Sequence, residues 1–259
     1  MDLKDKVALV TGAGSGIGRA AALRLAEEGA DLALVSRSPD EIEEVAQEVR
    51  GKGRKAVAIP ADISDEEAML RVFEGIEEQF GRLDIVFANA GINGVWAPIE
   101  ELKPQEWDKT IAVNLRGTYL TAHYAVPMLK RQGGVILITS SINGTRTFAT
   151  PGASAYSVSK AGQVALAQML ALELADDGIR VNVICPGAIE SKIEENTERR
   201  NTEDIIVPRE FPQGSVPLTG GKPGKAEDVA DLVAFLASDR ARHISGTPVW
   251  IDGAQSLLV

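Results

Sequence analysis

The stretch VALVTGAGSGIG, at residues 7–18, decides the fold. Its first four residues form a short apolar run, which predicts a strand buried on both faces. A glycine-rich turn with glycines at Gly12, Gly16 and Gly18 follows and opens into a helical stretch that ends at Gly29. A strand, a glycine turn and a helix N-terminus together form a cradle for phosphate groups. The stretch therefore predicts a dinucleotide-binding site, with a tight structural turn as the alternative.

The same alternation of strands and helices continues to the end of the chain. Apolar runs at 32–35, 56–59, 83–88, 134–139, 179–184 and 248–251 predict further strands, and long helices are expected over 107–131 and 155–175. Helix starts with a capping box are expected at Ser38 and Ser64. No linker or repeat interrupts the series, so we expect one doubly wound, Rossmann-type α/β domain over residues 1–259. Its parallel sheet would have seven strands and helices on both faces.

Composition excludes several classes of partner. A net charge of −10 over 259 residues disfavours nucleic acid and anionic membranes. No apolar run approaches the ~18 residues of a membrane span, and the charged start of the chain does not resemble a secretory signal. A single cysteine, Cys185, excludes an internal disulfide and suits a reducing, cytoplasmic compartment. With only two histidines beside it, no metal site is expected.

Polar and small residues follow several of the expected strands, at the sheet edge where open α/β folds bind ligands. Asp62 follows the third strand, where it would lie beside an adenine amino group or serve as a turn residue. Asn89 begins a small-residue turn after the fourth strand, and Ser140 and Ser141 follow the fifth. These side chains are expected to meet at one edge of the sheet.

The end of the second strand bears on the choice of cofactor. A dinucleotide fold that selects NAD carries an acid there for the ribose hydroxyls, whereas this chain has Ser36 and Arg37. The nearest acids, Asp40 and Glu41, are accounted for by the start of the next helix. NADP(H) is therefore favoured, because a guanidinium is available for its 2′-phosphate. NAD(H) remains possible if Arg37 is only a solvated side chain.

Tyr156 and Lys160 stand four residues apart, which places them on one face of a helix. A nearby ammonium lowers the pKa of a phenol, and such a tyrosine can exchange a proton with a carbonyl or alcohol oxygen. The pair alone also arises by chance. Asn114, in the middle of a long helical stretch, is a further polar residue that needs partners if it is buried.

Taken in order, these residues resemble the short-chain dehydrogenase/reductase family from about residue 4 to residue 253. The glycine turn resembles the family's cofactor turn, and residues 251–253 its closing motif, although Ala254 stands where a second glycine is common. The remaining matches are the Asn-Ala-Gly element (Asn89, Ala90, Gly91), the catalytic set (Asn114, Ser141, Tyr156, Lys160) and the segment that contacts the nicotinamide carboxamide (Pro186, Gly187, Ile189, Ser191).

The resemblance implies an NAD(P)(H)-dependent oxidoreductase that interconverts a secondary alcohol and a ketone. Tyr156 would be the acid/base, Ser141 would hold the substrate oxygen, Lys160 would lower the pKa of Tyr156 and bind the nicotinamide ribose, and Asn114 would hold a water. The cofactor contacts expected are Gly12, Ser15, Gly16, Ile17, Gly18, Ser36, Arg37, Asp62, Ile63, Asn89, Ala90, Gly91, Tyr156, Lys160, Pro186, Gly187, Ile189 and Ser191; the substrate contacts are Ser141, Asn143 and Tyr156.

The substrate stays open among 3-oxoacyl compounds, sugars or polyols, and other small carbonyl compounds. A polar, glycine- and proline-rich segment at about residues 190–224 is expected to be the substrate loop. The resemblance also implies a homotetramer or homodimer that uses the two long helices. The alternative from another class is a non-catalytic dinucleotide-binding sensor or scaffold on the same fold.

Overall fold

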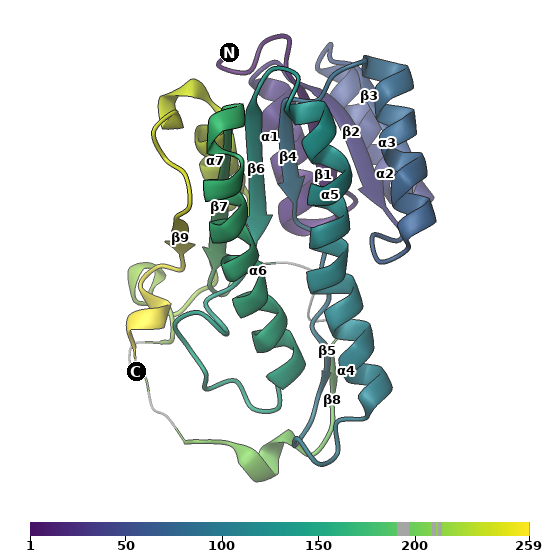
Figure 1. Ribbon diagram of the computed structural model, residues 1–259. Coiled ribbons are helices and arrows are strands. Elements are labelled where there is room, and N and C mark those ends of the chain that lie inside the picture. Colours follow the sequence, from purple (N-terminus) through teal and green to yellow (C-terminus); the bar gives the residue numbers. More distant parts are fainter. Residues whose placement is uncertain (191–196, 209–210, 212–213, 259) are drawn as a thin grey trace.

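A seven-stranded parallel sheet forms the centre of the protein, with the strand order β3-β2-β1-β4-β6-β7-β9 (Figure 1). The computed structural model describes residues 1–190, 197–208, 211 and 214–258. The doubly wound sheet expected from the sequence is confirmed. Its strands are β1 (Val7–Thr11), β2 (Asp31–Ser36), β3 (Ala56–Pro60), β4 (Ile85–Ala88), β6 (Gly134–Thr139), β7 (Ile179–Pro186) and β9 (Pro248–Ile251).

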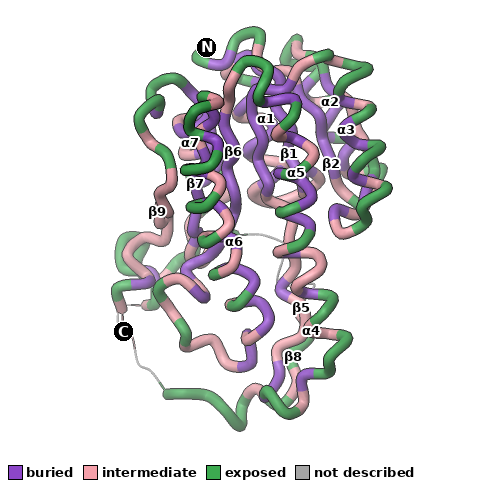
Figure 2. Tube along the Cα trace, in the orientation of Figure 1, coloured by how far each residue is buried: buried purple, intermediate pink, exposed green. Residues whose placement is uncertain are grey.

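Helices cover both faces of this sheet because successive side chains of each strand point to opposite sides. In β1, Ala8 and Val10 pack with α1 (Gly16–Glu27), α2 (Pro39–Gly51) and α7 (Ala226–Ala237). Val7 and Leu9 pack on the other side, with α3 (Glu66–Phe80), α5 (Gly117–Leu129) and α6 (Ser154–Glu173). The strands are accordingly buried along most of their length, while the outer helix faces are exposed (Figure 2).

The helix expected over 107–131 is interrupted at Asn114. The structure has α4 (Pro104–Ile111), a π-helical turn η1 (Ala112–Arg116) and then α5. In this turn the carbonyl oxygen of Asn114 accepts hydrogen bonds from Thr118 Oγ1 at 2.7 Å and from Gln163 Nε2 at 2.9 Å. The expected long helical stretch is therefore present, but the π turn within it was not predicted. Such π turns are common at functional sites.

The two expected capping boxes also differ from the structure. Ser38 is the N-cap of α2 as predicted, but its hydroxyl makes no capping hydrogen bond. In α3 the N-cap is Asp65, whose carboxylate accepts from the Ala68 N–H at 2.9 Å, and not Ser64. Ser64 is not available for this role because its hydroxyl and its N–H both donate to Asp62.

A second, two-stranded parallel sheet was not predicted from the sequence. It joins β5 (Gly94–Trp96) to β8 (Thr197–Arg199), beside α4 and away from the main sheet (Figure 1). The pairing is reinforced by Arg200, which donates to Glu106 at 2.6 Å. Part of the segment expected to be the substrate loop is thereby fastened to the body of the protein.

No helix in the described part of the chain has both the length and the apolar character that crossing a membrane requires.

Candidate active site

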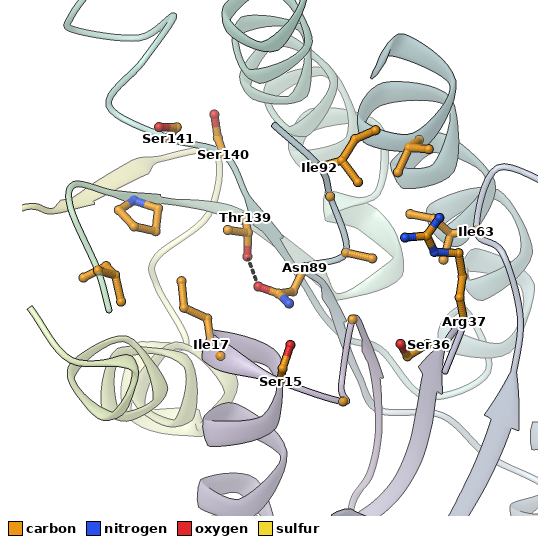
Figure 3. Close-up of a pocket in the computed structure, with 18 of the residues that line it drawn as sticks. Ser15, Ile17, Ser36, Arg37, Ile63, Asn89, Ile92, Thr139, Ser140 and Ser141 are labelled. Carbon is orange, nitrogen blue, oxygen red and sulfur yellow. Dashed lines mark hydrogen bonds between the residues drawn. The ribbon is translucent and has the colours of Figure 1, made fainter. Parts of the chain in front are cut away.

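A cavity of about 510 Å³ opens at the carboxyl ends of the central strands (Figure 3). Parallel strands direct their carboxyl ends to one edge of the sheet, so residues far apart in sequence meet there. The residues from the expected set that line the cavity are Gly12, Ser15, Gly16, Ile17, Ser36, Arg37, Asp62, Ile63, Asn89, Ala90, Gly91, Ser141, Tyr156, Lys160, Pro186, Gly187 and Ile189. Gly18, Asn114 and Asn143 are not among the lining residues, and Ser191 lies outside the described residues.

The glycine turn forms an anion cradle at the start of α1. Gly12 has φ +67° and Gly16 φ +51°, a backbone region that favours glycine. Gly18 has a packing role, because a methyl group there would overlap the Gly12 carbonyl oxygen. The first turn of α1 contains no acidic residue, and the Ser15 hydroxyl makes no capping hydrogen bond. The helix therefore brings no carboxylate of its own to the N–H groups at its start, which fits a dinucleotide pyrophosphate.

Asn89 joins three strands behind the cradle. Its Nδ2 donates to the Thr11 carbonyl at 3.2 Å, and its Oδ1 accepts from Thr139 Oγ1 at 3.1 Å (Figure 3). Thr11 Oγ1 in turn accepts from the N–H groups of Asn89 and Ala90, at 3.0 and 3.1 Å. These bonds fix the floor of the cavity, because each polar atom of the Asn89 side chain already has a partner.

The far end of the cavity mixes charges of opposite sign. Arg37 lies near Ile63 at this end (Figure 3), and Asp62 lines the same wall. Burial raises the pKa of Asp62, but hydrogen bonds from Ser64 and the positive charge of Arg37 outweigh it, so the pKa is lowered overall. Glu41 also lines the cavity, and a methyl group on Gly14 would come within 2.9 Å of its Oε2.

Glu41 is a lining residue that the sequence prediction missed. It had been assigned only to the start of α2, yet in the third position of that helix its side chain reaches back over Gly14. A glutamate shortly after the second strand was the available signal. Other lining residues that were missed are Gly14, Ser38, Ala61, Ile92, Val113, Thr139 and Ser140, mostly neighbours of predicted ones.

Tyr156, Ser141 and Lys160 lie together at the other end of the cavity, on α6 and after β6. All three are buried, at 9%, 7% and 3% exposure. Burial raises the pKa of the Tyr156 phenol, and a hydrogen bond with Ser141 opposes this only in part. Burial also lowers the pKa of Lys160 to about 8. The phenol is therefore protonated at neutral pH, as a proton donor must be.

Burial sets the direction of the Tyr156 pKa in this structure, and the lowering of that pKa by Lys160 stays a prediction. Lys160 Nζ donates to the Thr139 carbonyl at 2.9 Å and lies 5.5 Å from the centre of the Tyr156 ring. Its position is fixed by β6, and burial dominates the pKa of the phenol.

Asn114 stands behind this group and is fully buried. Its Oδ1 accepts from the Ile92 N–H at 2.8 Å, and its Nδ2 donates to the Ile92 carbonyl at 2.9 Å and to Ser159 Oγ at 3.1 Å. Both N–H groups of the side chain are thus used. A methyl group on Gly91 would lie 3.2 Å from Asn114 Oδ1 and 3.6 Å from Lys160 Nζ, so the two polar atoms flank the same glycine.

Asn143 lies beside Ser141, and Trp96 lies beside Tyr156. Asn143 Oδ1 accepts from Thr147 Oγ1 at 3.0 Å and Thr150 Oγ1 at 2.8 Å, which shapes the loop before α6. The ring of Trp96 lies 6.5 Å from that of Tyr156. Asn143, expected to contact substrate, thus has its oxygen engaged by its own loop.

In the described part of the chain, no three His, Cys, Asp or Glu side chains cluster as metal ligands would.

A glycine cradle and a buried Ser-Tyr-Lys group share one cavity, which is the arrangement of an NAD(P)-dependent oxidoreductase acting on CH–OH and C=O groups. A family model described as "Enoyl-(Acyl carrier protein) reductase" matches residues 12–254. The chain belongs to the short-chain dehydrogenase/reductase family.

Similar proteins agree with this assignment. A crystal structure of a 3-ketoacyl-ACP reductase from Sinorhizobium meliloti 1021 is 58% identical, with a TM-score of 0.94, and covers 98% of this chain and 100% of its own. Levodione reductase from Leifsonia aquatica is 38% identical over 97% of this chain and 94% of its own length. The 3-oxoacyl-[acyl-carrier-protein] reductase FabG of Thermotoga maritima is 35% identical over 98% of both.

The cofactor differs among solved relatives. One relative, 34% identical to this chain, is complexed with NADH, and another, 35% identical, is in complex with NADP. Membership of the family therefore identifies the cofactor as a nicotinamide dinucleotide but does not decide between NAD(H) and NADP(H).

Proposed function

We propose that this protein reduces a ketone to a secondary alcohol with Tyr156 as the proton donor. One observation carries the proposal: the phenol of Tyr156 is buried with a raised pKa, is hydrogen-bonded with Ser141, and lines the same cavity as the glycine cradle. A neutral phenol suits the reductive direction, in which a proton must be given to the carbonyl oxygen as hydride reaches the carbon.

Each residue then has a defined task. The nicotinamide, when bound, supplies the hydride, and the segment with Pro186, Gly187 and Ile189 would hold it. Ser141 donates a hydrogen bond to the substrate oxygen and keeps it in line with Tyr156. Tyr156 transfers its proton to that oxygen and becomes a phenolate. The ammonium of Lys160 stabilises this phenolate until a proton from solvent restores the phenol.

Asn114 acts behind Lys160. Its side chain has one acceptor lone pair left on Oδ1 after the bond from Ile92, and this atom and Lys160 Nζ both border the space beside Gly91. A water held there would connect Lys160 with Asn114, which is the role that the family resemblance implies.

For the cofactor we favour NADP(H), with NAD(H) also accepted. Arg37 and the Ser36 hydroxyl line the adenosine end and suit a 2′-phosphate. Glu41 opposes this preference, because a carboxylate repels the phosphate and accepts hydrogen bonds from unsubstituted ribose hydroxyls. We therefore expect a modest preference and not an exclusive one.

For the substrate we put 3-oxoacyl thioesters first, because the 58% identical structure bears the name of a 3-ketoacyl-ACP reductase. Sugars, polyols and other small ketones are the competing class, and a cyclic diketone is the natural member to include given levodione reductase. The segment at 190–224, anchored by β8 next to Trp96, is the proposed substrate loop.

The experiment is a turnover comparison across these substrates with NADPH and NADH, monitored by loss of reduced-nicotinamide absorbance. A higher kcat/KM for 3-oxoacyl thioesters than for free ketones and sugars supports the first choice. A higher kcat/KM for cyclic diketones or sugars would change the proposed substrate class but not the proposed reaction. If the protein binds the cofactor tightly but no substrate causes oxidation of NADPH or NADH, the proposal that it is an enzyme is contradicted.

We also propose a homotetramer or homodimer in the cytoplasm. The outer faces of α5 and α6 expose large apolar side chains, among them Tyr119, Val158, Met169 and Leu172. Such a surface suits a second copy of the chain. Sedimentation that finds only monomer for the wild type would exclude this, and Leu172→Glu is expected to dissociate the assembly.

A further inference from the structure

The chain ends in a hook, residues 252–258, that follows β9 and turns back toward the cavity edge. Asp252 organises it: one carboxylate oxygen accepts from the Ala254 N–H at 3.1 Å and the other from the Ser256 N–H at 2.9 Å. The short helix η7 (Gln255–Leu257) follows. The hook is therefore a defined element with its own hydrogen bonds, not a loose end.

The hook is bonded directly to the segment with Pro186, Gly187 and Ile189, all of which line the cavity. Gln255 Oε1 accepts from the Ala188 N–H at 2.7 Å. The contact is close as well as polar, because a methyl group on Gly187 would come within 2.6 Å of Gln255 Oε1 and 2.7 Å of Asp252 Cβ. A side chain at Gly187 and the hook could not both fit.

The same segment is held from two other directions. The Gly187 N–H donates to the Ile251 carbonyl at 3.1 Å, and the Ala188 carbonyl accepts from the Gly224 N–H at 2.9 Å. Both polar backbone groups of Ala188 are thus paired outside the cavity, one to Gln255 and one to Gly224. This leaves the cavity side of the segment free for a ligand and fixes where its lining residues stand.

The backbone is strained at the start of the hook. Ala254 has φ +69° and ψ +12°, a left-handed conformation that costs an alanine of order 1 kcal/mol. Strain of this kind persists where the surroundings require it and is concentrated at functional sites. Here the requirement is visible, since the left-handed residue turns the chain so that Gln255 meets Ala188.

From this geometry we propose that Gln255 is a positioning residue for the nicotinamide half of the cofactor: its side-chain oxygen holds the Ala188 N–H and thereby fixes the segment that bounds the nicotinamide. The inference rests on the proposed function, in which that segment contacts the nicotinamide. It concerns one end of the cavity, because the hydrogen bond from the hook reaches Ala188, which stands between the lining residues Gly187 and Ile189.

The test compares two ligands on two variants. Gln255→Met keeps the length of the side chain and removes the acceptor, whereas Gln255→Glu keeps an acceptor oxygen. Dissociation constants are measured for NADPH and for adenosine 2′,5′-bisphosphate, which carries only the adenosine half. Gln132→Met is the matched control, because Gln132 also bonds a backbone group, the Leu83 carbonyl, at 2.7 Å but away from the cavity.

Loss of one such hydrogen bond predicts about tenfold weaker NADPH binding for Gln255→Met. Binding of the adenosine fragment is expected to stay unchanged, and Gln255→Glu is expected to bind NADPH more tightly than Gln255→Met. Hydrogen exchange gives a second readout that needs no turnover. The Ala188 amide should exchange faster in Gln255→Met and remain protected in the Gln132→Met control.

Three outcomes overturn the inference: unchanged NADPH binding in Gln255→Met, equal weakening of NADPH and of the fragment, or an Ala188 amide that stays protected without the acceptor. Failure of the proposed function looks different, because the wild-type protein would then oxidise neither NADPH nor NADH with any of the substrates, whereas the binding and exchange measurements on Gln255→Met need no turnover.

Discussion

The two ends of the cavity are built in opposite ways. At the catalytic end Ser141, Tyr156 and Lys160 are buried, and their polar groups are held by neighbouring strands and helices. At the adenosine end Arg37 is exposed, Glu41 is half-buried, and their charges are opposite. We therefore expect burial to determine the reaction, and a balance of exposed charges to determine the choice of cofactor. Substitutions should have large effects at the first end and smaller effects at the second.

The largest effect is expected from Tyr156→Phe, which removes the proton donor and leaves the ring in place. General acid catalysis contributes about 10²–10⁴-fold, so kcat should fall by that factor while the dissociation constant for NADPH changes little. Steady-state kinetics and a fluorescence titration measure the two quantities. Tyr119→Phe, on the exposed face of α5, is the control and should keep full activity. Retained turnover in Tyr156→Phe would refute the assignment of the acid.

A smaller effect is expected at the adenosine end. Arg37→Ala removes charge-assisted hydrogen bonds worth about 1.5–3 kcal/mol, so NADPH binding should weaken about 10- to 100-fold with little change for NADH. Glu41→Gln removes the repulsion and should shift the ratio of the two affinities toward NADPH. The control is Arg71→Ala, an exposed arginine on α3. Equal losses for NADPH and NADH in Arg37→Ala would contradict the cofactor proposal.

The burial of Lys160 should also make the stability of the protein depend on pH. Burial lowers the pKa of Lys160 from 10.5 to about 8, so the folded protein loses this proton at lower pH than the unfolded chain. Between these values the unfolded state binds more protons, and stability therefore rises with pH. From pH 8 to 9 the gain from Lys160 is about 1 kcal/mol by this linkage.

Burial has the opposite consequence for Cys185, whose pKa is raised from 9.0 to about 11, and by the same linkage this removes about 0.3 kcal/mol between pH 8 and 9. The gain from Lys160 is the larger of the two effects, and comparison with Lys160→Met separates it. Urea unfolding at both pH values should show the gain in the wild type and in the exposed control Lys109→Met, but not in Lys160→Met. An equal gain in Lys160→Met would place the titration elsewhere.

The sheet predicted from the sequence is confirmed, and the structure brings Ser141, Tyr156 and Lys160 into one cavity, because both depend on local patterns. Buried strands read as apolar runs, and the resemblance to the family is carried by residues at strand ends that parallel topology brings together. Asn114 marks the limit of this reasoning. Its neighbours in sequence predict one helix, whereas its carbonyl oxygen lies in a π turn and accepts a hydrogen bond from Gln163, which comes from another helix.

The adenosine end was harder for a related reason. Glu41 fitted a capping pattern, and capping and cavity contacts compete for the same side chain. Only the tertiary position of Gly14 beneath it decides the outcome. Pairing of β5 with β8 likewise joins short segments about a hundred residues apart, which no local pattern reports.

Ala254→Gly should have the smallest effect, and it tests whether the catalytic end tolerates strain for the sake of position. Glycine adopts φ +69° without the steric cost that alanine bears, but it also gives the unfolded chain more conformational freedom, which opposes the gain. We expect a gain in unfolding free energy of up to about 1 kcal/mol. Ala68→Gly, in the first turn of α3, increases the freedom of the unfolded chain in the same way but relieves no steric strain. Its free energy of unfolding should therefore fall by about 0.5–1 kcal/mol.

The difference between these two variants, measured by urea unfolding, isolates the strain stored at Ala254. A loss of stability in Ala254→Gly as large as that in Ala68→Gly would mean that the left-handed alanine costs nothing. If instead stability rises while NADPH binding weakens, the strained residue confines the hook to the conformation that places Gln255 against Ala188. The hook would then resemble the buried Lys160, because in both places a cost to folding holds a side chain in position at the same end of the cavity.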